Sequence, residues 1–172
     1  MNKKKTKMKY YFTADFHIGH ANIIRYCKRP FKDVNEMREK IIRNWNTIVK
    51  DEDILFHIGD FVSSYEKVNI ENIINRLNGQ IIFIKGNHDR GPLFKIQDAM
   101  FILGQQQLHL VHIPEEAQAD YNLVGHVHEK WKTKKVGDHF CINVGVDQWN
   151  FTPVSIKQIS RIINENETNE KI

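Results

Sequence analysis

The chain has 172 residues, 41% of them hydrophobic and 27% charged, which is usual for a globular protein that buries a sizeable core. The formal net charge is +4, but five lysines between Lys3 and Lys9 supply much of it, so charge gives nucleic-acid binding only modest support. Two cysteines, Cys27 and Cys141, are too few for a zinc–cysteine site or a disulfide framework.

The organisation expected from these numbers is a single domain over residues 1–172. It has a basic tail at 1–7 and a frayed polar tail at 165–172. No apolar run is long enough to cross a bilayer, and the start of the chain lacks the apolar core of a signal peptide. We therefore expect a cytoplasmic protein without a membrane partner. The sequence does not predict its oligomeric state.

Apolar periodicity predicts alternating strands and helices in the first half of the chain. In chain order they are a strand at 8–14, a helix at 34–49, a strand at 53–58, a helix at 66–77 and a strand at 81–85. Asp33 is a plausible N-cap of the first helix, with Glu36 completing a capping box, and Trp45 is expected in the core. The second half predicts strands at 99–103, 108–112, 122–124 and 139–144, then a helix at 155–163.

Polar side chains gather directly after several of these strands. They are Asp15 and His17, Asp60, Asn87 and His88, His112, and His126 and His128. Ligands of open α/β sheets bind beyond the carboxyl ends of the strands, so these side chains are expected to share one site. Residues at i and i+2 of an extended segment share a face, so Asp15 and His17 can point at one place. His57 lies inside its strand and is expected to be structural.

Carboxylate, imidazole and amide donors together suit manganese, iron, zinc, nickel or cobalt, and they are too rich in nitrogen for calcium. Seven candidate ligands are too many for one ion that must keep a position open for substrate. Two ions that share a bridging carboxylate fit the count. Such a pair, roughly 3.5–4 Å apart, can clamp the attacking and leaving oxygens of an in-line phosphoryl displacement.

The ordered blocks Asp15-x-His17, Gly59-Asp60, Gly86-Asn87-His88-Asp89, His112 and Gly125-His126-Val127-His128 resemble the calcineurin-like metallophosphoesterase superfamily. The resemblance covers the chain from about Met8 to Val154. A closer resemblance is to short bacterial and phage phosphoesterases of this superfamily. It rests on the stretches 19–24, 29–31 and 143–147, the last followed by Trp149.

The resemblance implies an α/β fold of the four-layer αββα type, in which two mixed sheets pack face to face with helices outside. It assigns one metal to Asp15, His17, Asp60 and His128, and the other to Asp60, Asn87, His112 and His126. Asp60 would bridge the two ions, for which manganese is the expected metal. His88 would be the catalytic acid that protonates the leaving group, and Asp89 would orient His88 or its loop.

For several positions the sequence allows more than one assignment. His109 is an alternative to His112 as a ligand because both lie in one predicted strand, but His112 stands at the end of that strand, where the family's histidine stands. Asp60 is not followed by the Asp-Arg-Gly of Ser/Thr protein phosphatases, which argues against that class. Candidate substrate contacts are His20, Asn22, Arg25, Arg29 and Trp149. The alternative to a role in substrate binding is that Arg25 and Arg29 lie on a helix surface and that Trp149 is packed against other side chains.

The function expected from the sequence is a dinuclear metal-dependent phosphoesterase. It would hydrolyse phosphomonoesters or phosphodiesters by in-line attack of a metal-bound hydroxide. The partner is a phosphoester substrate, with nucleotides and nucleic acid included, so a nuclease acting on DNA or RNA is one alternative. A metal-binding scaffold without catalysis is the other. The complete ligand set and the presence of His88 favour the enzyme.

Overall fold

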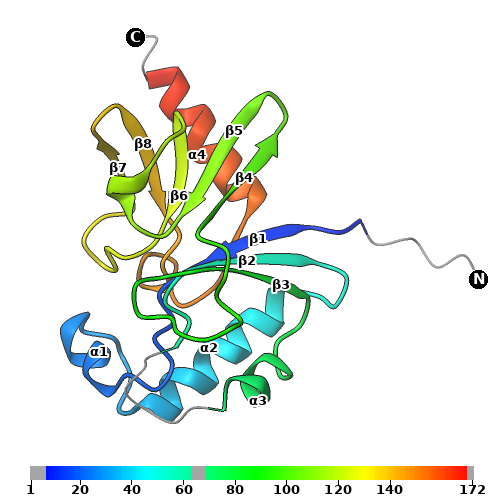
Figure 1. Ribbon diagram of the computed structural model, residues 1–172, viewed down its shortest axis with the longest axis vertical. Helices are drawn as coiled ribbons and strands as arrows, with labels where there is room; N and C mark the ends of the chain where they lie inside the picture. The colour runs from blue at the N-terminus through cyan, green and yellow to red at the C-terminus, as the bar shows by residue number, and fades with distance from the viewer. Residues whose placement is uncertain (1–6, 63–68, 170–172) are drawn as a thin grey trace, which may run out of the picture.

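The computed structural model describes residues 7–62 and 69–169, which form two β-sheets and four α-helices (Figure 1). The first sheet has the order β3–β2–β1–β9, and its strands are β1 (Tyr10–Thr13), β2 (Ile54–Ile58), β3 (Gln80–Ile84) and β9 (Val154–Ser155). The second has the order β4–β5–β6–β8–β7. Its strands are β4 (Asp98–Leu103), β5 (Gln106–Val111), β6 (Tyr121–Val124), β7 (Thr133–Val136) and β8 (His139–Asn143).

Both sheets mix parallel and antiparallel pairs. In the first sheet β1, β2 and β3 run parallel and β9 pairs antiparallel with β1. In the second, β5, β6 and β8 run parallel, while β4 and β7 are antiparallel edge strands. The helices are α1 (Ala21–Tyr26), α2 (Val34–Ile48), α3 (Ile70–Ile74) and α4 (Ile156–Asn169), with short 3₁₀ turns η1 (Pro114–Glu116) and η2 (Val146–Gln148).

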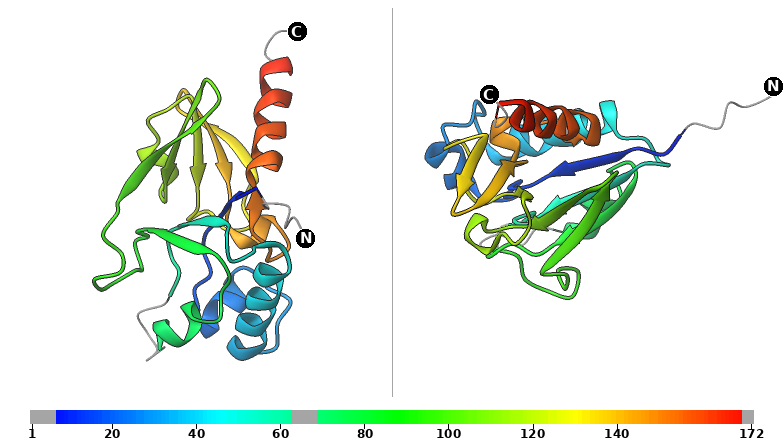
Figure 2. Two further views of the ribbon diagram at one scale, coloured as in Figure 1. Left: turned by 90° about the vertical axis from the view of Figure 1, so that its right-hand side faces the viewer. Right: turned by 90° about the horizontal axis from the view of Figure 1, so that it is seen from above.

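Successive side chains of a strand point to opposite faces of the sheet, and this divides the core into layers. On β1, Tyr11 packs with α2 residues such as Met37 and Trp45, whereas its neighbour Phe12 packs against the second sheet. The cluster between the sheets joins residues of both, among them Ile58, Ile84, Leu110, Leu123 and Ile142. Figure 2 shows the two sheets in two further views, with α2 covering the outer side of the first.

The C-terminal helix packs differently from α2. Its buried residues Ile159 and Ile163 join the cluster between the sheets, next to β1 and β9. The opposite face of the second sheet carries a smaller cluster that includes Val111, Val124 and Cys141. The fold class expected from the sequence is confirmed, since two mixed sheets pack together with helices beside them.

Most predicted elements are present, with differences at their ends. Helix α4 continues to Asn169, so residues 165–169 are helical and not frayed, because Ile159 and Ile163 anchor the helix on the core. The sequence did not predict α1 or β7. The tail residues 1–6 and 170–172 and the predicted helical residues 66–68 lie outside the described part of the chain.

Helix α2 begins as expected but is capped in a slightly different way. Asp33 is the N-cap, and its Oδ1 accepts from the backbone N–H groups of Asn35 and Glu36. The Glu36 carboxylate accepts from the N–H of Lys32 instead of from that of the N-cap, so the expected capping box is displaced by one residue. Within the described residues, no helix combines the length and the apolar character needed to cross a membrane.

Candidate metal centre

All seven predicted ligands lie where the carboxyl ends of parallel strands from both sheets meet. Asp15 follows β1, Asp60 follows β2, Asn87 follows β3, His112 follows β5, and His126 and His128 follow β6. Two hydrogen bonds join the two sheets at this point. Nδ1 of His112 lies 2.9 Å from the carbonyl oxygen of Ile58, and the N–H of His126 donates to Oδ1 of Asp15 over 3.0 Å.

The backbone is strained at most of these positions. Left-handed φ angles occur at Asp15 (62°), His17 (50°), Asp60 (59°), His126 (71°) and His128 (50°). A residue with a Cβ atom pays roughly 1–2 kcal/mol for this conformation. Such strain persists only where the surrounding structure holds it, and it is concentrated at functional sites.

Two glycines make room for the cluster. Gly59 has a φ of 83°, and a Cβ atom there would overlap the ring of His112. Gly86 needs its missing side chain for a different reason, because a Cβ atom there would overlap Oδ1 and the amide nitrogen of Asp60. Substitution at either glycine would therefore displace a predicted ligand.

Asp15, His17 and His128 form the first group, with one ligand atom from each within 4.8 Å of the others. The rings of His17 and His128 stack with centroids 5.0 Å apart. Both ring nitrogens of His17 are buried, and neither makes a hydrogen bond with a described residue. Burial lowers the pKa of His17 to about 2, so the ring is neutral and keeps a lone pair for a metal.

Asp15, Asp60 and His112 form the second group, again within 4.8 Å. Asn87 adds its side-chain oxygen beside it. Oδ1 of Asn87 lies 3.1 Å from Nε2 of His112 and 3.1 Å from Nδ1 of His126. The structure therefore brings together the four residues that the sequence assigned to the second metal.

Asp60 belongs to the second group and also faces the first. Its Oδ2 is 3.5 Å from Nε2 of His17 and 3.3 Å from Nε2 of His112, so one oxygen faces one histidine of each predicted set. Burial acts to raise the pKa of Asp60, but the hydrogen bond from His112 and the charges of His112 and His17 lower it overall. For His112, burial acts to lower the pKa, but the same carboxylate raises it to about 9.

These side chains fit a pair of divalent ions. Two buried carboxylates, an amide oxygen and four imidazoles match the ligand preference of borderline transition metals. The buried nitrogens of His17 make no hydrogen bond with a described residue and lie in a group with Asp15 and His128, where an ion could satisfy one of them. Asp15 belongs to both groups, and Asp60 touches a histidine of each.

His88 lies beside the cluster without belonging to either group. Its backbone N–H donates to Oδ1 of Asp60 over 2.9 Å, and its ring centroid is 5.4 Å from that of His17. His109, the rival of His112, points elsewhere. Its Nε2 lies 3.5 Å from Oδ1 of Asp98, and none of the predicted ligands contacts it. The geometry therefore favours His112 over His109 as a ligand.

Asp89 was predicted to act in catalysis by orienting His88 or its loop, and its carboxylate contacts the backbone of that loop and of the loop after β2. Its two oxygens accept from the backbone N–H groups of Gly86, Asp60, Phe61 and Val62. It is fully buried. Asp89 thus holds the two loops that carry Asp60 and His88, and it has no hydrogen bond with the ring of His88. It is a positioning residue.

Two predicted substrate contacts have other partners in the structure. Arg29 is buried, and its guanidinium donates to the Asp147 carboxylate, to the carbonyl oxygens of Asp15 and Phe16, and to Sδ of Met37. These contacts occupy its five N–H groups, so none is left for a phosphate. Nε1 of Trp149 donates to the carbonyl oxygen of Asn143, and Nζ of Lys132 lies 3.7 Å from the centre of one face of its ring.

The other three candidates lie on or next to α1. His20 caps this helix, with its Nδ1 accepting from the N–H of Ile23, and its ring centroid is 5.9 Å from that of His17. Asn22 and Arg25 are exposed on α1. A role for these three in substrate binding stays a prediction.

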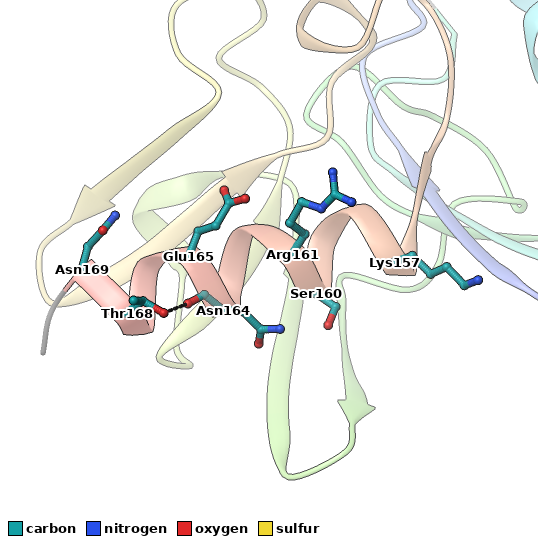
Figure 3. A pocket seen from close by; sticks show the side chains of 7 residues that line it. All are labelled: Lys157, Ser160, Arg161, Asn164, Glu165, Thr168 and Asn169. Carbon is teal, nitrogen blue, oxygen red and sulfur yellow. Dashed lines mark hydrogen bonds between the residues drawn. The ribbon is translucent and has the colours of Figure 1, made fainter.

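The sequence analysis missed two features near the centre. Asp147 lies behind His128, with its Oδ2 3.4 Å from Nδ1 of that ring. A hollow of about 210 Å³ also opens beside Asn87 and His112, where Lys85 and Arg90 supply positive charge. Another hollow runs along α4 (Figure 3), but helix-surface side chains line it and no predicted ligand does. Of these two hollows, the one beside Asn87 could therefore receive part of a substrate bound at the centre.

The comparisons with known proteins point to one family. The family model described as calcineurin-like phosphoesterase matches residues 8–164. The chain is 34% identical over 166 residues to the "Uncharacterized protein MJ1445" of Methanocaldococcus jannaschii, covering 91% of this chain and 92% of that protein. It is 29% identical over 117 residues to the "Gene 66 protein" of Mycobacterium phage L5, covering 67% of this chain and 56% of that protein.

Among solved structures, the protein AQ665 of Aquifex aeolicus has the same fold. The TM-score is 0.74 at 24% identity, and the match covers 91% of this chain and 100% of that one. The family match spans every predicted ligand, and the archaeal relative is similar over almost its whole length. The chain therefore belongs to the calcineurin-like phosphoesterase family.

Proposed function

We propose that this protein hydrolyses phosphate esters with the help of two divalent metal ions, manganese in the first instance. The position of Asp60 carries the proposal, because its Oδ2 faces one histidine of each ligand set. Asp15, His17 and His128 would complete one site, and Asn87, His112 and His126 the other. Two ions held there would activate a water as the nucleophile and offset negative charge on the phosphoryl group.

The protein's own groups supply the rest of the reaction. The water oxygen forms a bond to phosphorus, and the bond from phosphorus to the ester oxygen breaks. The departing oxygen then needs a proton. The ring of His88 would supply it, since the hydrogen bond from its N–H to Asp60 keeps the residue beside the ligands without making it one. The attacking water gives up a proton in the same reaction, and a proton taken back from that water or from solvent returns His88 to its starting state.

The hollow beside Asn87 and His112 offers a place for the part of the substrate that does not react. Nη1 of Arg90 donates to the carbonyl oxygens of Asn87 and Asp89 over 2.7 and 2.8 Å. Its guanidinium is thereby fixed at the rim of the hollow, near Lys85. The exposed carboxylate of Glu116 also lines the hollow, but two cations against one anion still favour an anionic substrate, and nucleotides are the first compounds to test.

The experiment is a substrate screen at fixed manganese concentration. Phosphomonoesters, nucleotides, cyclic dinucleotides and DNA would each be assayed with the wild-type protein and with Asp60→Asn. The proposal expects turnover of at least one class and its loss in the variant. Wild-type protein that holds two ions but turns over none of these classes would favour a non-catalytic scaffold. Cleavage confined to DNA would favour the nuclease.

A further inference from the structure

We infer that the buried ion pair between Arg29 and Asp147 positions three ligands of the first metal, namely Asp15, His17 and His128. The inference rests on the proposed function only in requiring that metal be bound. It assigns a task to two residues that belong to neither ligand set. The consequence is specific, because loss of the pair should weaken the first metal site and spare the second.

The ion pair between Arg29 and Asp147 has a geometry that holds both side chains in one orientation. Nε and Nη2 of Arg29 donate to Oδ1 and Oδ2 of Asp147, each over 2.8 Å. The Arg29 side chain is fully buried, and that of Asp147 is 3% exposed. A two-pronged pair of this kind fixes the angle between the two side chains as well as their distance.

Arg29 also holds the strained segment that carries two ligands. Its Nη2 donates to the carbonyl oxygen of Asp15 over 2.7 Å, and its Nη1 to that of Phe16 over 3.1 Å. Asp15 and His17 both have left-handed φ angles, so this turn needs support from outside. A lysine could not replace the arginine, because an ammonium group is a single point and cannot reach three separated acceptors in one plane.

Asp147 acts on the third ligand. Its Oδ2 lies 3.4 Å from Nδ1 of His128, which leaves Nε2 of that ring for a metal. A carboxylate behind a ligating histidine is the usual means of fixing the ring and its tautomer. Backbone support comes from the same segment, since Asn143 and Gln148 donate to the carbonyl oxygen of His128 over 2.8 and 2.9 Å.

The second site lacks this support. The structure shows no hydrogen bond or ion pair from Arg29 or Asp147 to Asn87, His112 or His126 among the described residues. Nδ1 of His112 instead faces the carbonyl oxygen of Ile58 at 2.9 Å. Apart from Asp15, which belongs to both groups, the two sites are therefore supported by different groups, which makes the inference testable site by site.

The test is a manganese titration of Asp147→Asn. Binding is monitored by calorimetry and by the electron paramagnetic resonance signal of bound Mn²⁺. We expect the first-site affinity to fall about 10- to 100-fold, as is typical when a partner of a ligating histidine is removed. The second site should change by less than about threefold. The signal of a coupled ion pair should give way to that of a single ion. Arg29→Lys is the second variant and should behave in the same way.

The control is Glu39→Gln, which breaks the exposed pair between Arg76 and Glu39 and should leave both affinities unchanged. Circular dichroism in chelator shows whether each metal-free variant is folded. Two ions bound as tightly in Asp147→Asn as in wild type, or equal weakening of both sites, would overturn the inference while the proposed function stands. A wild-type chain that binds two ions without turnover overturns only the proposed function, and one that binds none overturns both.

Discussion

The amide N–H of Asp60 donates to Oδ2 of Asp89 over 2.7 Å, and the same oxygen accepts from the N–H of Gly86. One buried carboxylate thus joins the loop after β2 to the loop after β3. The predicted bridging ligand and His88 are held in register by a residue that belongs to neither ligand set. This support can be tested apart from catalysis.

Asp89→Ala should lower the free energy of unfolding of the metal-free protein by about 3 kcal/mol or more. The change leaves several buried N–H groups without an acceptor, at about 1–3 kcal/mol each. Urea unfolding in chelator measures the loss. Asp33→Ala is the matched control, because Asp33 also accepts from two amides but at the exposed start of α2. There we expect a loss of about 1 kcal/mol. Equal losses would show that Asp89 is not the support described.

His112→Ala should lose the second metal, and His109→Ala should keep both. Nε2 of His112 lies 3.3 Å from Oδ2 of Asp60, whereas Nε2 of His109 faces Asp98. Elemental analysis after dialysis against manganese gives the number of ions per chain. The reverse result would mean that His109 is the ligand, although the fold and the class of reaction would stand.

His57 should make the protein sensitive to acid. Its ring is buried against Phe16 and Phe61, with centroids 4.7 and 5.0 Å away, and its nitrogens have no hydrogen-bond partner among the described residues. Burial lowers its pKa from 6.5 to about 3. The unfolded chain therefore binds a proton below pH 6.5 that the folded chain does not, and stability is lost as the pH falls from about 6.5 towards 3.

The measurement is urea unfolding of chelator-treated wild type and His57→Phe at pH 7.5 and pH 5.0. A group that titrates only in the unfolded state changes the free energy of unfolding by about 1.4 kcal/mol per pH unit. The stability difference between the two pH values should be smaller by about 2 kcal/mol in the variant. Other titrating groups contribute equally to both proteins and cancel. Identical differences would show that His57 does not titrate between the folded and unfolded states.

His88→Ala should keep both metals but lose activity in a way that depends on the leaving group. A nitrophenolate, with a conjugate-acid pKa of about 7, departs without a proton at neutral pH, and general acid catalysis of a basic alkoxide is worth about 10²- to 10⁴-fold. The variant should lose far more rate on a nucleotide ester than on a nitrophenyl ester. Both are measured at saturating manganese. Equal losses would show that His88 positions the phosphate and does not act as the acid.

Much of the fold followed from local pattern. Helix α2 has apolar residues at Met37, Ile41 and Trp45 that recur on one face, and the strands that end in the site are short apolar runs. Strand β7 could not be predicted in this way, because Thr133–Val136 is an edge strand of mostly exposed residues with no apolar alternation. Edge pairing depends on the partner strand and leaves little trace in the sequence.

The support around the site could not be found from local pattern. Arg29 and Asp147 are 118 residues apart in the chain, and each reads alone as an ordinary charged residue. Their pairing depends on how the segment between α1 and α2 packs against η2 in the folded chain. Asp89 follows His88 directly, which suggested a joint role, but its side chain turns to the backbone amides of Asp60 and Gly86. The ligand types and their order were visible in the sequence, and their supporting contacts were not.

The proposed function depends above all on Asp60 bridging two ions. The most direct measurement is the number of manganese ions per chain, by elemental analysis, in wild type and Asp60→Ala after dialysis against the same free manganese concentration. We predict about two ions in wild type and a loss of at least one in the variant, because Oδ2 of Asp60 faces His17 and His112 at 3.5 and 3.3 Å. A single ion in wild type, bound equally well by Asp60→Ala, would contradict the account.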